Sequence, residues 1–443
     1  MIYKNKNILI FGLGKSGIAC LKYLQKHACQ LFIYDADKSI LKKYKKSSVN
    51  IIADDNLQCL DLVILSPGIS KGDNLLTKIL SLNIPVISEL EFAYQNLKSK
   101  NIIAITGTNG KTTTTELCSE LLSNNYKVYK CGNIGLPVTD CVNKVNKDDF
   151  VVIEVSSFML EEVQTFAPKI AIITNLAEDH LDRYNSVQDY QQTKIKITKN
   201  QKKEDYLILN ENLENYNIQT NARKYFFSTN KEVVGVYCNN GKIYFKKDIN
   251  IDAVYIANIN KIHLYGEYNL ENILASVCCA ILCGIDKQSI QNVINNFNCI
   301  EHRFEKITTI NGVEFVNDSK ATNIHATLHA VKDVKAVVHL LLGGSDKGED
   351  FDKLFLNLPS NVKAYLFGST TNKMVNSCLH VGFKNFKICF NMKDALEKAY
   401  SNAKKKEMVL LSPACASFDS FTSFEERGKQ FKEWVFSLYE KME

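Results

Sequence analysis

Short apolar runs alternate with longer amphipathic stretches along most of the 443-residue chain. Four such runs in the first part hold mainly Ile, Leu and Val, and they lie at Asn7 to Phe11, Leu31 to Asp35, Leu62 to Ser66 and Pro85 to Ser88. Runs of this length are typical of strands that are buried on both faces of a parallel sheet, and the amphipathic stretches between them are typical of covering helices. The pattern therefore predicts a small parallel sheet at the start of the chain.

The same alternation continues to the C-terminus and predicts two further α/β units. Between them, Val233 to Cys238 and Lys242 to Lys246 flank Asn239-Asn240-Gly241, which predicts a hairpin because Asn and Gly tolerate positive φ. The other expected strands lie near Ile102 to Thr106, Phe150 to Val155, Ile170 to Asn175, Glu314 to Asn317, Val337 to Leu342, Ala364 to Phe367 and Met408 to Leu411.

The length of the chain supports a division into three domains. At about 100 to 200 residues per domain, 443 residues predict two to four. No stretch rich in Pro, Gly or Ser marks a linker, so the strand pattern sets the boundaries. We predict an α/β protein of three domains, each built on a mostly parallel sheet with flanking helices: a Rossmann-like N-terminal domain over 1–97, a P-loop central domain over 98–299 and a Rossmann-like C-terminal domain over 300–443.

Composition indicates an ordinary globular protein, with 45% hydrophobic and 23% charged residues. No apolar run approaches the roughly 20 residues that span a bilayer, and no secretion signal precedes the first strand, so we expect a soluble, cytoplasmic protein without a membrane span. The fourteen cysteines form no C-x-x-C pair, and we expect most of them to be reduced and buried. The net charge of +6 is modest, and the lysine cluster at 42–46 has little aromatic interleaving. We therefore expect no nucleic-acid partner, and we expect a monomer.

The most informative motif follows the strand at 102–106 and reads Gly107-Thr108-Asn109-Gly110-Lys111-Thr112-Thr113. A glycine-containing turn that leads into a helix can hold the phosphates of ATP on backbone N–H groups, with Lys111 at the terminal phosphates and the Thr112 hydroxyl on Mg²⁺. The common phosphate-binding pattern would require glycine where Ile105 stands. The motif therefore predicts an ATP loop of a narrower type.

A second glycine motif, Gly12-Leu13-Gly14-Lys15-Ser16-Gly17, follows the first strand, and Asp35 ends the next one. Glycines in this spacing, with an acid about 20 residues later, are typical of dinucleotide-binding domains, so an NAD-dependent dehydrogenase is an alternative. However, the predicted sheet ends after about four strands and the ATP loop follows at once. We therefore interpret this turn as a site for one nucleotide, that of a UDP-linked substrate.

Acidic and histidine side chains follow two strands of the central domain. Glu154 ends the run at 150–154, where a carboxylate beside an ATP loop can hold the Mg²⁺ of the nucleotide. The next strand leads to Glu178-Asp179-His180-Leu181-Asp182-Arg183-Tyr184, which places several charged or metal-binding groups in one turn. Because parallel strands end at the same sheet edge, we expect these groups near the ATP loop.

These segments together resemble the Mur ligase family, the amide-forming enzymes that add amino acids to UDP-N-acetylmuramate during peptidoglycan synthesis. The resemblance rests on the loop at 106–113, on Glu154-Val155-Ser156-Ser157-Phe158, on Asn175 to Tyr184 and on Lys194, in order and spacing. It implies two Mg²⁺ ions, the second held by His180 and by a carbamate that CO₂ forms on Lys194. From the residues alone, Lys194 would be a solvated helix lysine.

The resemblance also implies further contacts to ATP. Gly266-Glu267-Tyr268-Asn269-Leu270-Glu271-Asn272 is similar to a family segment whose last asparagine contacts the adenine, although Tyr268 replaces the usual histidine. In the third domain, Arg303 is expected at the phosphates and Asp318 at the ribose, which suits the chemistry of both side chains. The catalytic residues implied are Lys111, Glu154, His180 and Lys194.

The segments Ser412 to Phe421 and Phe424 to Gly428 resemble the branch of the family that adds D-glutamate to UDP-N-acetylmuramoyl-L-alanine. That resemblance implies that Thr322, Lys347, Ser417 and the backbone of Phe424 hold D-glutamate. It also implies that the UDP-sugar substrate lies on Lys15, Ser16, Asp35, Ser66, Pro67, Gly68 and Asn133, with Ser156 and His180 as further substrate contacts. Met159 stands where the family usually has glutamine.

The activity expected from this resemblance is an ADP-forming ligation through an acyl phosphate. Folylpolyglutamate synthases share the loop type, so another ligase of this kind is an alternative. The NAD-dependent dehydrogenase and a nucleotide-binding regulator without turnover are further alternatives.

Overall fold

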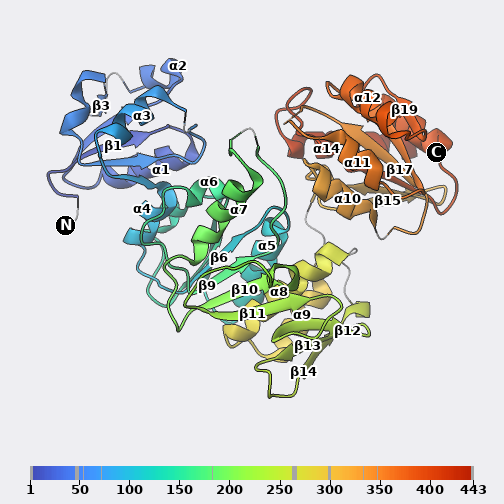
Figure 1. Cartoon of the computed structure of the whole chain (residues 1–443), viewed down its shortest axis with the longest axis horizontal. Helices are drawn as coiled ribbons and strands as arrows, with labels where there is room; N and C mark the ends of the chain where they lie inside the picture. Colours follow the sequence, from blue (N-terminus) through green and yellow to red (C-terminus); the bar gives the residue numbers. More distant parts are fainter. Residues whose placement is uncertain are drawn as a thin grey trace. The chain divides into compact units, whose positions relative to one another are not determined.

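The computed structural model describes residues 3–44, 49–52, 54–70, 72–181, 183–261, 267–297, 301–332, 334–346 and 348–440. It contains three mostly parallel sheets with flanking helices, which confirms the predicted fold class (Figure 1). The chain forms two compact units. The first unit holds the N-terminal and central sheets, and the second holds the C-terminal sheet together with Glu178–Asp182 and Ile262–Leu270.

The N-terminal sheet has five parallel strands in the order β3-β2-β1-β4-β5, one more than the four predicted. The missed strand, β3, has only two residues, both exposed, so it leaves no apolar run in the sequence. The elements are β1 Asn7–Phe11, α1 Lys15–Leu24, β2 Gln30–Tyr34, α2 Lys38–Lys42, β3 Asn50–Ile51, η1 Asp54–Cys59, β4 Leu62–Leu65, α3 Asn74–Ser81, β5 Val86–Ser88 and α4 Glu89–Asn96.

The central sheet has nine strands in the order β14-β13-β12-β11-β10-β9-β6-β8-β7. The predicted hairpin is confirmed, because β12 and β13 pair antiparallel around Asn240 and Gly241, both with positive φ. The strands are β6 Ile102–Thr106, β7 Val128–Gly132, β8 Phe150–Glu154, β9 Ile170–Ile173, β10 Tyr206–Asn210, β11 Arg223–Ser228, β12 Gly235–Asn239, β13 Lys242–Lys246 and β14 Val254–Asn258. The helices are α5 Lys111–Ser123, η2 Val138–Cys141, α6 Ser157–Leu160, α7 Val187–Ile195, η3 Lys196–Thr198, η4 Glu211–Leu213, η5 Ile259–Lys261, α8 Glu267–Leu282 and α9 Lys287–Asn296.

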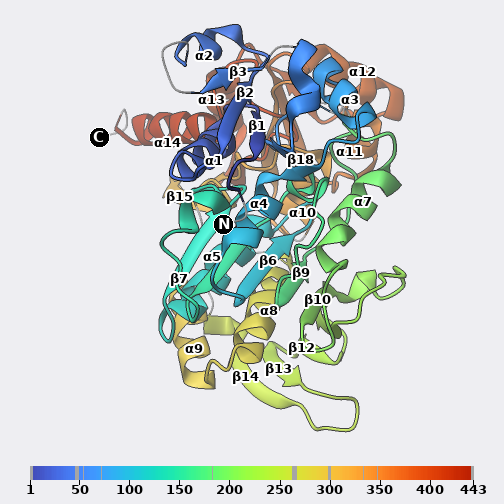
Figure 2. The same ribbon diagram turned by 90° about the vertical axis from the view of Figure 1, so that its left-hand side faces the viewer.

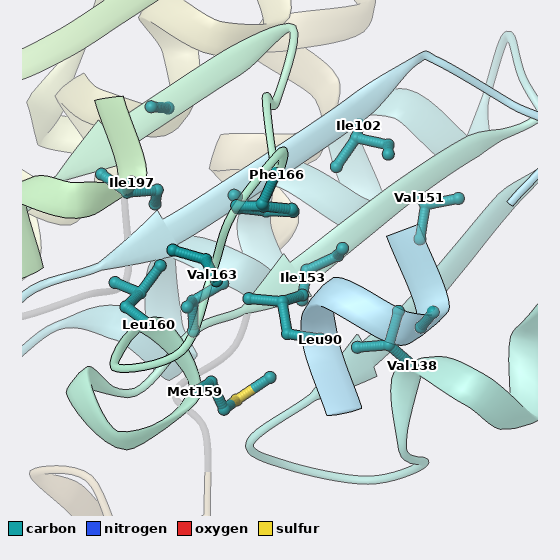
Figure 3. Packing of buried hydrophobic residues seen from close by; sticks show 14 of the residues in the cluster. Leu90, Ile102, Val138, Val151, Ile153, Met159, Leu160, Val163, Phe166 and Ile197 are labelled. Carbon is teal, nitrogen blue, oxygen red and sulfur yellow. The ribbon is translucent and has the colours of Figure 1, made fainter. Parts of the chain in front are cut away.

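Helix α4, which follows the last N-terminal strand, joins the two sheets of the first unit. Its Leu90 is buried in the same core as Ile153 of β8 and Val138 of η2 (Figure 3). Its Glu91 is fully buried and accepts hydrogen bonds from the backbone N–H groups of Gln164, Thr165 and Phe166. A buried carboxylate needs such donors, so Glu91 ties the helix to the loop after α6.

The C-terminal sheet of the second unit has six strands in the order β15-β16-β20-β17-β18-β19, all parallel except the β15–β16 pair. Side chains alternate between two cores: Leu340 and Leu342 of β17 pack on one face, and Leu341 on the other. The elements are β15 Glu305–Ile310, β16 Val313–Asn317, α10 Ile324–Lys332, β17 Val338–Gly343, α11 Phe351–Asn357, β18 Val362–Phe367, α12 Thr371–Val381, β19 Phe386–Ile388, α13 Met392–Asn402, β20 Met408–Leu411 and α14 Phe424–Glu440.

Two expectations from composition concern the whole chain. Most of the described cysteines are buried and carry free thiols, as predicted. Within the described residues, no helix is both long enough and apolar enough to cross a membrane.

Candidate nucleotide and substrate site

The expected ATP loop leaves β6 and enters α5 through two glycines with positive φ, Gly107 at +145° and Gly110 at +82°. Positive φ favours glycine, and space demands it as well, because a Cβ at Gly107 would collide with the Thr174 hydroxyl. The Asn175 amide holds the other side of the loop: its Oδ1 accepts from the Asn109 N–H at 2.9 Å, and its Nδ2 donates to the Asn109 carbonyl at 3.1 Å. Thr174 and Asn175 therefore shape the loop, a role that sequence reasoning did not assign.

Lys111 lies at the start of α5, and its ammonium group points back into the loop. Its Nζ donates to the carbonyl oxygens of Gly107 and Thr108, each at 2.8 Å. Thr112 and Thr113 follow in the first turn of the helix and are buried. The loop therefore combines a helix N-terminus with a cation, which is the arrangement that binds phosphate.

Asn272, predicted to contact the adenine, is buried on α8 beside α5. Its Oδ1 accepts from the Thr114 hydroxyl at 3.2 Å. A Cβ at Gly110 would collide with this same Oδ1. Asn272 therefore lies against the end of the ATP loop.

Glu154 ends β8, as expected, and only one of its carboxylate oxygens has a hydrogen bond within the described residues. Oε1 accepts from Nδ2 of Asn133 at 2.9 Å. Oε2 is buried and, like the buried hydroxyl of Ser156, has no hydrogen-bond partner in the described part of the chain. Buried carboxylate oxygens are rarely left in this state, and a hard cation is one partner that satisfies them.

Lys194 is buried, with 1% of its surface exposed, so the interpretation of this residue as a solvated helix lysine was wrong. Its Nζ donates to the carbonyl of Gly107 at 2.8 Å and lies 4.6 Å from the centre of the Tyr190 ring. Lys111 donates to the same carbonyl. Two ammonium groups therefore meet at one oxygen of the ATP loop.

A cavity of about 430 Å³ lies in the first unit, where the N-terminal and central sheets meet. Two contacts fix its walls: the Leu13 N–H donates to Oδ2 of Asp35 at 2.7 Å, and the Ser66 hydroxyl donates to the Gly12 carbonyl at 2.8 Å. Met159 also lines it. The cavity brings together every residue of the first unit that we assigned to the UDP part of the substrate, namely Lys15, Ser16, Asp35, Ser66, Pro67, Gly68 and Asn133.

In the second unit, Asp318 follows β16 and lies buried beside Arg303. Its carboxylate accepts from the Phe304 N–H at 3.2 Å and from the Ser412 hydroxyl at 2.8 Å. Burial raises the pKa of Asp318 to about 7, against the lowering effect of the Ser412 hydroxyl and of the nearby arginines.

This raised pKa predicts a loss of stability as the pH rises. Between pH 4 and 7 the folded Asp318 keeps a proton that the unfolded chain has released, so its contribution disappears as the pH passes its folded pKa of about 7. We expect the C-terminal domain to lose about 2 to 4 kcal/mol of unfolding free energy between pH 5 and 7.5 in the wild type, and much less in Asp318→Asn. Trp434, the single tryptophan, reports unfolding of this domain by fluorescence.

Asp346→Asn is the control, because the Lys373 ammonium at 2.7 Å helps to hold the pKa of Asp346 below its ordinary value. The stability that this pair contributes is lost only at acidic pH, below the range measured. Asp346→Asn should therefore lose as much unfolding free energy between pH 5 and 7.5 as the wild type does. If the wild type and Asp318→Asn lost the same unfolding free energy between pH 5 and 7.5, the raised pKa of Asp318 would be contradicted.

Arg427 of α14 organises the segment that we assigned to D-glutamate. It is fully buried, and its guanidinium donates to the Cys415 carbonyl at 3.0 Å and to the Ser319 carbonyl at 2.8 Å. The Ser319 hydroxyl in turn donates to the Phe424 carbonyl at 2.8 Å. Arg427 thus joins the turn after β16 to the loop that contains Ser417, which is itself buried. The sequence motif contained Arg427, but no role was predicted for it.

Replacing Arg427 with lysine should destabilise the C-terminal domain by about 2 to 4 kcal/mol. One ammonium cannot reach every acceptor of the planar guanidinium, so buried carbonyls lose their partners. Urea unfolding followed through Trp434 measures the change, with the exposed neighbour Lys429→Ala as the control. An unchanged urea midpoint in Arg427→Lys would show that the hydrogen bonds of the Arg427 guanidinium do not stabilise the domain.

The remaining predicted residues also lie in the second unit. His180 has a positive φ of +55°, and its Nε2 lies 3.8 Å from Oδ2 of Asp179, which accepts from the Asn323 amide at 3.2 Å. Thr322 is half-buried in the turn before α10, and Phe424 begins α14. The positions that lie outside the described residues are Lys347, Asp182, Gly266 and the lysines at 45 and 46.

Comparisons with known proteins match three successive parts of the chain to domains of one family. The chain matches the Mur ligase MurD-like N-terminal domain over residues 6–88, the Mur ligase middle domain over 105–280 and the glutamate ligase domain of Mur ligases over 302–415. It is 38% identical to a protein of Caldicellulosiruptor bescii and to one of Thermoanaerobacter sp., both named UDP-N-acetylmuramoylalanine--D-glutamate ligase. Each match covers 99% of this chain and at least 99% of the relative.

Solved structures show the same fold at low sequence identity. MurF ligase of Thermotoga maritima, solved in complex with ADP, superposes with a TM-score of 0.61 at 15% identity, over 100% of this chain and 96% of that one. A pseudomurein peptide ligase type C of Methanothermus fervidus gives a TM-score of 0.59 at 18% identity, over 98% and 100% of the two chains. With full-length relatives at 38% identity and three matching domains, the chain belongs to the Mur ligase family.

Proposed function

We propose that this protein adds D-glutamate to UDP-N-acetylmuramoyl-L-alanine in peptidoglycan precursor synthesis, with conversion of ATP to ADP and phosphate. The observation that carries the proposal is the hydrogen bond between Asn133 and Glu154, 2.9 Å long. Asn133 lines the cavity assigned to the UDP-sugar, and Glu154 ends the strand beside the ATP loop. The two sites therefore meet within one compact unit.

The reaction begins when the alanyl carboxylate attacks the γ-phosphorus of ATP in line. A bond forms between the carboxylate oxygen and phosphorus as the bond to ADP breaks, which gives an acyl phosphate. Lys111 and the N–H groups at the start of α5 stabilise the charge on the transferred group. The amine of D-glutamate then attacks the activated carbonyl, and the tetrahedral intermediate releases phosphate as the amide forms.

The donor set beside the ATP loop suits Mg²⁺. Oε2 of Glu154 is a buried carboxylate oxygen that lacks a hydrogen-bond partner among the described residues, and Thr112 contributes a hydroxyl. We propose that these two hold one ion, and that His180 and Lys194 hold a second. When bound, Mg²⁺ would neutralise charge on the phosphates and on the transferred group.

A carbamate on Lys194 would remove the repulsion between two ammonium groups in this loop. The ammonium groups of Lys111 and Lys194 share the Gly107 carbonyl, and in a buried position like charges repel each other strongly. Once the Lys194 ammonium has released a proton, its neutral Nζ adds CO₂ and releases a second proton, which replaces one cation with an anion, and the remaining N–H can still donate to the carbonyl. We propose this modification as the source of the second metal ligand.

The second unit would supply the amino-acid site. We propose that Thr322, Ser417 and the backbone of Phe424 hold the two carboxylates of D-glutamate, with Lys347 as the charged partner. Arg427 acts as a positioning residue, since it fixes the loop that contains Ser417. We also propose that the protein works in the cytoplasm, where ATP and UDP-linked precursors are made, as a monomer with domains over 1–97, 98–299 and 300–443.

Phosphate release tests this function directly. It should require UDP-N-acetylmuramoyl-L-alanine and D-glutamate together with ATP, and L-glutamate or a folate should not replace them. Release with folate and glutamate would instead indicate a folylpolyglutamate synthase, and NAD reduction would indicate a dehydrogenase. ATP binding without any turnover would indicate a regulator.

A further inference from the structure

A second cavity, of about 500 Å³, lies between α1 and η2 in the first unit. The wall formed by α1 and the turn after it includes Lys22 and Lys26, and the wall formed by η2 and the turn after it includes Asp140, Asn143 and Lys144. None of the residues that line this cavity also lines the UDP-sugar cavity. It is therefore a separate site, and its volume lies within the roughly 300 to 1,000 Å³ typical of small-molecule sites.

The charges around this cavity do not balance. Three lysines line it, with Asp140 as the only carboxylate among its lining residues. Many lysines elsewhere in the chain pair with Asp or Glu, for example at 2.8 Å between Lys6 and Asp61. In contrast, the ion pairs found among the described residues include none with Lys22, Lys26 or Lys144. An anionic ligand would supply the missing negative charge.

The cavity also has a fixed wall. Thr139 of η2 lines it and is buried, and both its N–H, at 2.7 Å, and its hydroxyl, at 2.6 Å, donate to Oε1 of Glu89. Glu89 is fully buried at the start of α4, which packs against both α1 and η2. Figure 2 shows α1 and α4 side by side at the junction of the two sheets. Buried contacts therefore set the spacing of α1, which carries Lys22, and of η2, and Lys26 and Lys144 lie in the turns directly after these elements.

We propose that this cavity binds a small phosphate-bearing anion that bridges α1 and η2. Lysine ammonium groups bind phosphate oxygens as mobile point charges, and three of them can surround a ligand with several negative charges. The amide of Asn143 adds a neutral donor on the same wall as Lys144. The proposal does not depend on the ligase reaction, since none of these residues belongs to the ATP loop or the UDP-sugar cavity.

Inorganic triphosphate is the probe for a footprinting experiment on the full-length protein. UDP and a non-hydrolysable ATP analogue, both at saturation, keep the probe out of the two nucleotide sites. Lysines are then acetylated with and without triphosphate, and mass spectrometry gives the extent of labelling at each position. We expect triphosphate to protect Lys22, Lys26 and Lys144, and to leave the exposed Lys147, three residues beyond the cavity, as reactive as before.

Calorimetry on variants provides the second measurement under the same saturated conditions. The double variant Lys22→Gln/Lys144→Gln should weaken triphosphate binding about fivefold or more, because two charge pairs are lost, whereas Lys147→Gln should bind like the wild type. All three changes lie on the surface, so the fold should be retained. Protection of Lys147 equal to that of the other lysines, or equal affinity in the wild type and the double variant, would overturn the proposal.

Discussion

Lys111→Ala should leave the protein folded and almost inactive. The ammonium group of Lys111 donates to two carbonyl oxygens of the expected ATP loop, and in the mechanism that we propose its removal takes away charge that stabilises the transferred phosphoryl group. We expect phosphate release to fall by at least about 10²- to 10³-fold. The fold should lose little, about 1 kcal/mol, because the side chain is half-buried and lies beside a second ammonium group.

Lys130→Ala is the matched control for this change. Lys130 is exposed on β7 and pairs with Glu116 of α5, so its removal takes one positive charge from beside that helix without touching the loop. It should retain wild-type turnover, since exposed pairs contribute about 1 kcal/mol or less. Turnover of Lys111→Ala within tenfold of the wild type would refute the role of this lysine at ATP.

Lys194→Ala should also be nearly inactive, and acetate should restore part of its activity. If Lys194 acts through a carbamate, the alanine variant leaves space beside Gly107 that a short carboxylic acid can enter, where it supplies one oxygen ligand to a cation. Chloride at the same ionic strength should have no effect. Phosphate release in acetate and in chloride measures the difference.

Lys194→Arg separates a carbamate from a buried cation. Arginine keeps the positive charge and can still donate to the Gly107 carbonyl, but it cannot carry the CO₂ adduct. This variant should be inactive if the carbamate is required. Lys196→Ala is the control and should keep its activity, because the half-buried ammonium group of Lys196 donates to the Glu161 carbonyl in the wild type and not to the loop. A ¹³C signal from labelled CO₂ should appear in the wild type and in Lys196→Ala, and should be missing in Lys194→Arg. An active Lys194→Arg, or a Lys194→Ala indifferent to acetate, would leave Lys194 with a purely structural role.

Most of the strands that the sequence pattern predicted are central strands, and the physical reason is their burial; β5 lies at a sheet edge but its three residues are also buried. β6, β8 and β9 are covered on both faces, so nearly every residue in them is apolar and the run stands out in the sequence. The missed strands include edge strands such as β3, β7 and β15, where solvent-facing residues interrupt the run. β10 is a different case: its run Tyr206–Asn210 is largely buried and could have been predicted.

The site residues also fall into two groups: those that a local sequence motif predicts, and those that only tertiary packing shows. The ATP loop was predictable because its glycines, lysine and threonines lie within seven consecutive residues, and local backbone geometry requires the two glycines. Lys194 looked like any helix lysine, and only the packing of α7 against the loop shows that it is buried. The hydrogen bond from Asn133 to Glu154 joins the residue after β7 to the last residue of β8, so no pattern along the chain predicts it.

The sequence by itself thus determined the three α/β domains, the phosphate-binding loop and the family likeness, because each depends on residues close together in the chain. Only the tertiary structure decided the local environment of distant groups: two lysines meet at one carbonyl, one buried carboxylate oxygen has no hydrogen-bond partner among the described residues, and Arg427 joins two loops. Such contacts depend on how helices pack on sheets, and the same side chain can be solvated or buried according to that packing.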